Sequence, residues 1–146
     1  MSLKATMIGT LAFVVLAAAS FGAAATWITD KEKALNAGAQ NLTANEIAER
    51  FAGKTVTFSA ASGDKKFLIF YSEDNEVAGK MIGGNWSDTG FYGVADNNTI
   101  CLSWNGSDKP RLRCFHVLLV NGVVKKFKAD GSLGGSIVKF EDGKIL

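Results

Sequence analysis

The two cysteines of the chain, Cys101 and Cys114, lie at mirror positions around one loop. Pairing Trp104 with Arg111 and stepping outward along both flanking segments brings Cys101 directly opposite Cys114. Opposed side chains on antiparallel strands have Cβ atoms about 4.5–5.5 Å apart, and a disulfide needs about 3.5–4.5 Å. The spacing therefore predicts a β-hairpin cross-linked by a Cys101–Cys114 disulfide, provided that the protein matures in an oxidising compartment.

The N-terminal segment supports such a compartment. Lys4 precedes an apolar run over residues 7–19, and an alanine run at 23–25 follows. This order is typical of a secretory signal peptide, so we predict a signal over residues 1–25 and a mature start near Thr26. The predicted location is periplasmic or secreted. Residues 5–25 carry no charge and are long enough to span a bilayer, so an uncleaved anchor in the inner membrane is the alternative.

Composition excludes some partners and favours a β-rich fold. The net charge of +2 becomes +1 without Lys4, which is too weak a field to attract nucleic acid. A membrane would then be contacted only through an uncleaved signal segment. Sixteen glycines, one proline and ten phenylalanines suit a single domain of short strands and tight turns.

The order of elements predicts the fold class. Residues 26–41 lack a strong apolar period and read as a flexible leader. Thr43 and Glu46 form a capping box that predicts a short helix over residues 44–52. About seven or eight short strands follow within the single domain at 42–146. We therefore predict a mainly β fold, a small antiparallel barrel or sandwich with one short N-terminal helix. The barrel is favoured because closure removes exposed strand edges.

The Asn121-Gly122 dipeptide is a strong hairpin signal. Its register pairs Leu118 with Lys125 and His116 with Phe127. Both faces of the segment before the turn are largely apolar, so its periodicity does not show which face is inside.

Aromatic side chains are the candidate ligand contacts. Trp86, Tyr92 and Trp104 can stack on a sugar or line an apolar pocket, although such residues in a small β domain more often belong to the core. Three lysines make a short basic strand, Lys125, Lys126 and Lys128, which we interpret as a solvated strand that resists edge pairing.

Other chemistry has little support. His116 is the single histidine and reads as a structural one, and no spacing resembles a metal or haem site, so neither a metal nor a cofactor is expected. Oxidised cysteines are not nucleophiles, and no catalytic residue is predicted. Carboxylates fall in predicted turns, where turn chemistry explains them.

A short pattern resembles a group of small exported proteins of Gram-negative bacteria that are known only as domains of unknown function. The matching residues are Gly84, Trp86, Cys101, Trp104, Cys114, Asp130 and Gly131. This resemblance implies an exported β domain with no assigned activity. The chain also resembles, more loosely, the barrel-shaped periplasmic inhibitors of secreted proteases, which implies an inhibitory role for residues 26–41.

The expected function is a non-enzymatic exported binding or interaction module. Its partner would be a small molecule, a glycan or another exported protein, with Trp86, Tyr92 and Trp104 as contacts. One alternative is an inhibitor of a secreted protease or hydrolase. A second is a hydrolase that uses two carboxylates about 5–10 Å apart.

Overall fold

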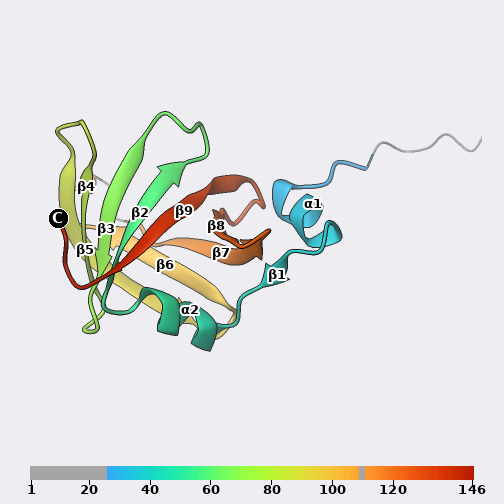
Figure 1. Ribbon diagram of the computed structural model, residues 1–146, viewed down its shortest axis with the longest axis horizontal. Helices are drawn as coiled ribbons and strands as arrows, with labels where there is room; N and C mark the ends of the chain where they lie inside the picture. The colour runs from blue at the N-terminus through green and yellow to red at the C-terminus, as the bar shows by residue number, and fades with distance from the viewer. Residues whose placement is uncertain (1–25, 109–110) are drawn as a thin grey trace, which may run out of the picture.

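The computed structural model describes residues 26–108 and 111–146, so the predicted signal peptide lies outside the described residues. Within these described ranges, eight antiparallel strands form a closed barrel, accompanied by one short extra strand and two short helices (Figure 1). The elements in chain order are α1 (Asp30–Asn36), β1 (Gln40–Asn41), α2 (Ala44–Phe51), β2 (Lys54–Ala60), β3 (Lys66–Tyr71), β4 (Glu76–Met81), β5 (Ser87–Ala95), β6 (Thr99–Trp104), β7 (Arg113–Val120), β8 (Val123–Phe127) and β9 (Leu133–Asp142).

The barrel is a meander with one rearrangement at its end. Strands β2 to β7 each pair with the next strand in sequence, β9 returns to pair with β2, and β8 lies between β9 and β7. The β7–β8 pairing closes the ring. The predicted antiparallel barrel is therefore confirmed, and closure leaves β2–β9 without a free edge along the ring.

The β6–β7 hairpin has the predicted register. Cys101 pairs with Cys114 and the two form a disulfide, with Cα atoms 3.9 Å apart. The ladder ends at Leu102 and Arg113, so Trp104 has no partner on β7. A disulfide is typical of proteins from an oxidising, non-cytoplasmic compartment. Among the described helices, none is both long enough and apolar enough to cross a bilayer.

The β7–β8 hairpin turns at Asn121-Gly122, as its sequence predicts, with both residues at positive φ. The structure also decides which face is inside. Phe115, Val117 and Leu119 of β7 pack with the barrel core, whereas His116 lies on the outer face near Lys31 of α1.

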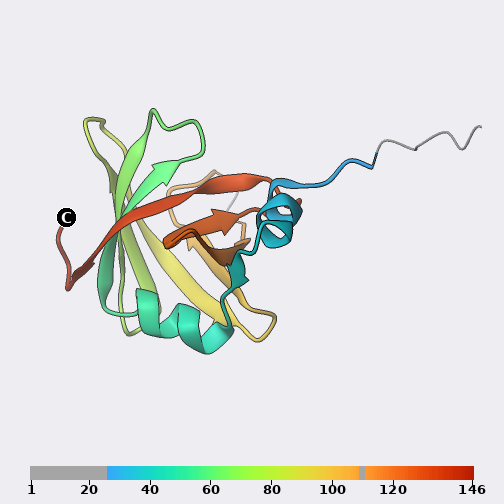
Figure 2. The same ribbon diagram turned by 45° about the vertical axis from the view of Figure 1, so that its right-hand side comes forward.

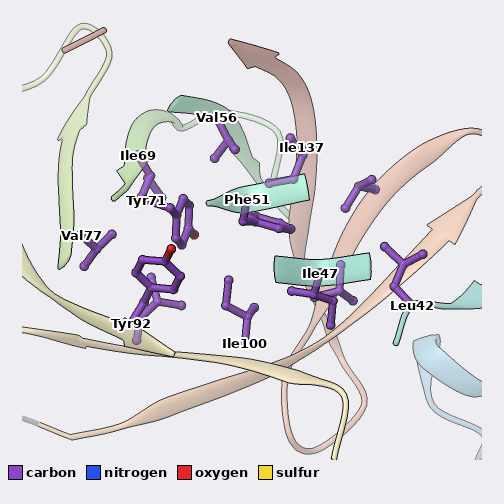
Figure 3. Close-up of a cluster of buried hydrophobic side chains, with 13 residues drawn as sticks. Leu42, Ile47, Phe51, Val56, Ile69, Tyr71, Val77, Tyr92, Ile100 and Ile137 are labelled. Carbon is purple, nitrogen blue, oxygen red and sulfur yellow. The ribbon is translucent and has the colours of Figure 1, made fainter. Parts of the chain in front are cut away.

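Helix α2 closes one end of the barrel (Figures 1 and 2). Thr43 and Glu46 form the predicted capping box, and Gly53 follows the helix at φ 72°. The helix buries Ile47 and Phe51 completely. The Phe51 ring meets the ring of Tyr71 edge to face at 5.1 Å, and Figure 3 shows both pointing into the core. The amphipathic helix α2 thus covers one end of the barrel with its apolar face.

Residues 26–41, which composition predicted to be a flexible leader, contain two elements of secondary structure. They contain α1, a second helix with its own capping box on Thr29, and β1, which pairs with Leu118 and Leu119 of β7. Lys31 N donates to Gly131 O at 2.9 Å, and Leu133 N donates to Asp30 Oδ2 at 3.1 Å. Hydrogen bonds that a composition argument does not reveal therefore hold α1 beside the turn between β8 and β9 and the start of β9.

Candidate functional site

The end of the barrel opposite α2 holds an open cavity. Strands β2, β4 and β6 finish at this end, and β3, β5 and β7 begin there, because α2 immediately precedes β2. The cavity has a volume of about 400 Å³. We call it the mouth cavity, and its described lining residues are Phe58, Phe67, Ile69, Trp86, Asp88, Trp104, Gly106, Ser107, Arg111 and Arg113.

Aromatic rings form the inner wall of the mouth cavity. Trp86 and Trp104 meet edge to face, with ring centroids 5.2 Å apart. Phe67 adds a second edge-to-face contact, 5.5 Å from Trp86, and Phe58 lies 6.3 Å from Phe67. Two of the three predicted ligand contacts are therefore brought together on one concave apolar surface. Such a surface can bind an aromatic or aliphatic body by stacking and by excluding water.

The third predicted contact lies elsewhere. Tyr92 does not line the mouth cavity; its ring packs against Tyr71 at 4.9 Å, and its hydroxyl donates to Ser72 O at 2.6 Å. Burial, with a smaller effect from Glu73, raises the pKa of Tyr92. Figure 3 shows Tyr92 within the core cluster, which gives its aromatic ring a packing role there.

Positive charge lines the rim of the mouth cavity. Arg111 and Arg113 are exposed where the chain enters β7. Asp88 is the one carboxylate among the described lining residues, and both of its oxygens accept from Gly106 N, at 3.1 and 3.0 Å. That pair of hydrogen bonds anchors the start of the β6–β7 loop. The arginines are thus the charged groups best placed to meet a ligand.

A second hollow lies beside the mouth cavity because β7 and β8 stop pairing at His116 and Phe127. The Cys114–Ala129 pair that a continued ladder would form is absent from the described pairings. This side hollow has a volume of about 370 Å³ and shares Arg111 and Arg113 with the mouth cavity. Lys128 and Phe115 complete the part of its lining that is relevant below.

The interpretation of β8 as a solvated basic strand is wrong for Lys126, which is buried. Its side chain is only 3% exposed and lies inside the barrel. The reason is the register of the hairpin: Lys126 pairs with Val117, whose side chain is in the core, and directly paired residues on antiparallel strands share a face. Lys125, on the other face, is more exposed.

Aromatic groups surround the Lys126 ammonium. Nζ donates to Tyr71 Oη at 3.2 Å and lies 4.5 Å from the Phe115 ring centroid and 5.6 Å from that of Phe58. No ion pair to Lys126 is present among the described residues. Burial lowers the pKa of Lys126 to about 7, and burial raises that of Tyr71. The interior thus contains an amine that is partly neutral near pH 7.

The remaining titratable candidate is peripheral. His116 is partly buried on the outer face, where burial and then the charge of Lys31 lower its pKa. Within the described part of the chain, no cluster of three or more histidine, cysteine or carboxylate side chains is arranged to hold a metal ion.

The sequence pointed to Trp86 and Trp104 but missed four other lining residues, Phe58, Phe67, Arg111 and Arg113, and the buried Lys126. For Lys126 a signal was present, since the Asn121-Gly122 register places it opposite Val117. For the four lining residues no local signal exists, because three different strands, β2, β3 and β7, and the loop before β7 bring them together. Comparisons with protein-family models, with curated proteins and with solved structures found no match to this chain.

Proposed function

We propose that this protein is a non-enzymatic binding module of the periplasm or the extracellular space, and that the mouth cavity is its ligand site. The ligand is a small molecule with an aromatic or otherwise apolar body and an acidic group. The body packs on Trp86 and Trp104, and the acidic group pairs with Arg111 and Arg113 at the rim. The disulfide and the closed barrel keep the site rigid.

The observation that supports this proposal is the tryptophan pair on the wall of an open cavity with two arginines at its rim. The volume of about 400 Å³ is within the usual 300–1,000 Å³ range of small-molecule sites. Arginine presents a planar set of donors that matches a carboxylate or sulfonate. A rigid site also loses little conformational entropy on binding, which favours affinity.

Titration with anilinonaphthalene sulfonate, an aromatic anion, tests the proposal. We expect the wild-type protein to bind this probe at one site and Arg113→Gln to bind it about ten- to a hundredfold more weakly, since a charged hydrogen bond is worth about 1.5–3 kcal/mol. Arg50→Gln is the matched control, because Arg50 is an exposed arginine of α2, at the closed end. Equal affinity in both variants, or no binding by the wild type, would reject the site.

The two alternative functions have less support. A carboxylate-dependent hydrolase needs two acidic groups in one cleft, whereas the described lining of the mouth cavity holds only Asp88, which is engaged by Gly106. An inhibitory role for residues 26–41 stays a prediction, and the structure shows this segment bonded to the barrel through β1 and α1.

A further inference from the structure

We propose that Lys126 is a covalent attachment site: its amine forms an imine with an aldehyde group on an apolar ligand seated in the mouth cavity, and the Tyr71 hydroxyl acts as the proton donor. This inference rests on the proposed binding function and names a substrate class for it.

The position of Lys126 brings its amine to the back of the site. The Phe58 ring lines the mouth cavity and also lies 5.6 Å from Lys126 Nζ. The Phe115 ring lines the side hollow and lies 4.5 Å from the same nitrogen. Each of the two hollows is therefore lined by one aromatic ring that also contacts the surroundings of the amine. The proposal requires the Phe58 side chain to rotate so that a ligand in the mouth cavity reaches Nζ.

The surroundings of Lys126 favour the nucleophilic form of the amine. Only a neutral amine attacks a carbonyl carbon. Burial among aromatic rings lowers the Lys126 pKa to about 7, so roughly half of the molecules carry a neutral amine at pH 7. A lysine with the ordinary pKa of about 10.4 is neutral in only about one molecule in 2,500 at that pH. A carboxylate beside Nζ would reverse this preference, and none forms an ion pair with it among the described residues.

Tyr71 is placed to assist the proton transfers. Its hydroxyl oxygen is 3.2 Å from Lys126 Nζ, and burial keeps its pKa raised, so it holds its proton at neutral pH. Because this protonated hydroxyl contacts the reacting nitrogen, it is placed to relay a proton between that nitrogen and the carbinolamine oxygen.

The reaction balances without an oxidant or a reductant. The amine lone pair attacks the carbonyl carbon, a C–N bond forms, and one nitrogen proton moves to the oxygen to give a carbinolamine. Tyr71 then donates its proton to the hydroxyl, the C–O bond breaks and water leaves. The remaining nitrogen proton returns to the Tyr71 oxygen. One amine and one aldehyde thus give one imine and one water.

Reductive trapping tests the assignment. The full-length mature protein is incubated at pH 7 with naphthaldehyde and cyanoborohydride, which reduces an imine to a stable secondary amine, and the labelled lysines are identified by peptide mapping. We expect Lys126 to be labelled at least about tenfold faster than any exposed lysine, because burial lowers its pKa to about 7 and so favours the neutral, nucleophilic amine. The α-amino group, also near neutrality with a pKa of about 7.7–8.0, is distinguished by mapping.

Two variants provide the controls. Lys126→Met removes the amine, keeps an unbranched apolar side chain and abolishes the fast labelling, whereas Lys125→Met, one residue away on the other face, retains it. Binding of anilinonaphthalene sulfonate is measured in parallel. Sulfonate binding without preferential Lys126 labelling overturns the imine proposal and leaves the binding function standing. If neither sulfonate binding nor preferential Lys126 labelling is observed, both the binding function and the imine proposal are overturned.

Discussion

The indole rings of Trp86 and Trp104 meet directly above Gly79 of β4. A Cβ atom added at Gly79 would lie 2.9 Å from Trp104 Cη2 and 3.0 Å from Trp86 Cη2. The vacant inward position on β4 is therefore occupied by the two indoles, which form the wall of the mouth cavity. A small residue on one strand thus sets the position of two side chains from elsewhere in the chain.

Gly79→Ala should displace the tryptophan pair. The new methyl group overlaps both rings, so we expect a destabilisation of about 1–3 kcal/mol, typical of overpacking, and an altered near-ultraviolet circular dichroism spectrum. Gly93→Ala is the matched control, since a Cβ there meets nothing within 4 Å. Identical spectra and unfolding midpoints for the two variants would show that Gly79 does not position the rings.

Lys126 should make the stability of the protein depend on pH. Below pH 7 Lys126 is protonated in both the folded and the unfolded chain, so the folded state carries the full free-energy cost of burying the charge. Between the folded pKa of about 7 and the usual 10.5, the unfolded chain binds more protons, so the free energy of unfolding rises with pH. We expect a rise of about 2–3 kcal/mol from pH 6 to pH 9 in urea unfolding.

The Lys126→Met variant should lack this rise in the free energy of unfolding, and it should be more stable than the wild type at pH 6. Comparison with Lys125→Met subtracts the contributions of the other titrating groups, because Lys125 lies on the other face of β8 and is more exposed than Lys126. Parallel stability curves for Lys126→Met and the wild type between pH 6 and pH 9 would contradict the burial of a charged amine.

The Cys101–Cys114 disulfide should contribute a large share of the stability. The two cysteines are 13 residues apart, and closing a loop of this size is worth about 3 kcal/mol on the chain-entropy model. We expect the Cys101→Ser, Cys114→Ser double variant to lose about that amount in urea unfolding. Mass spectrometry of the wild-type protein should show a gain of about two mass units on reduction, one hydrogen for each sulfur. Free thiols before reduction would contradict the bond.

The two helix caps should differ in their importance. Thr43→Ala removes the cap of α2, which buries Ile47 and Phe51, so we expect a loss of about 1 kcal/mol in global stability. Thr29→Ala removes an equivalent cap from α1, which buries none of its residues. Hydrogen exchange should show local fraying of α1 in that variant and little change in the barrel. Equal global losses would indicate that α1 is part of the cooperative core.

Local patterns predicted much of this fold. The cysteine spacing, the Asn121-Gly122 turn and the Thr43 capping box each specify geometry over a few residues, and each prediction is confirmed. The β1 pairing within residues 26–41 was not predicted, because it depends on a partner strand far along the chain. Pairing between distant segments leaves no local trace in a two-residue strand.

The candidate site was less predictable for the same reason. Trp86 and Trp104 attract notice as residue types, but their contact depends on the barrel register and on Gly79. Lys126 has the character of a surface residue, and average burial statistics place lysine outside. Only the combination of strand pairing with the inward face of β7 places it in the interior.

Two-dimensional NMR of the indole N–H groups tests the binding site most directly. The chain has three tryptophans, of which Trp27 is 95% exposed and outside the mouth cavity. On titration with anilinonaphthalene sulfonate, the signals of Trp86 and Trp104 should shift together along one saturable curve, while that of Trp27 stays in place. Binding that leaves the Trp86 and Trp104 signals unmoved, or that shifts Trp27 equally, would contradict a ligand site at the mouth of the barrel.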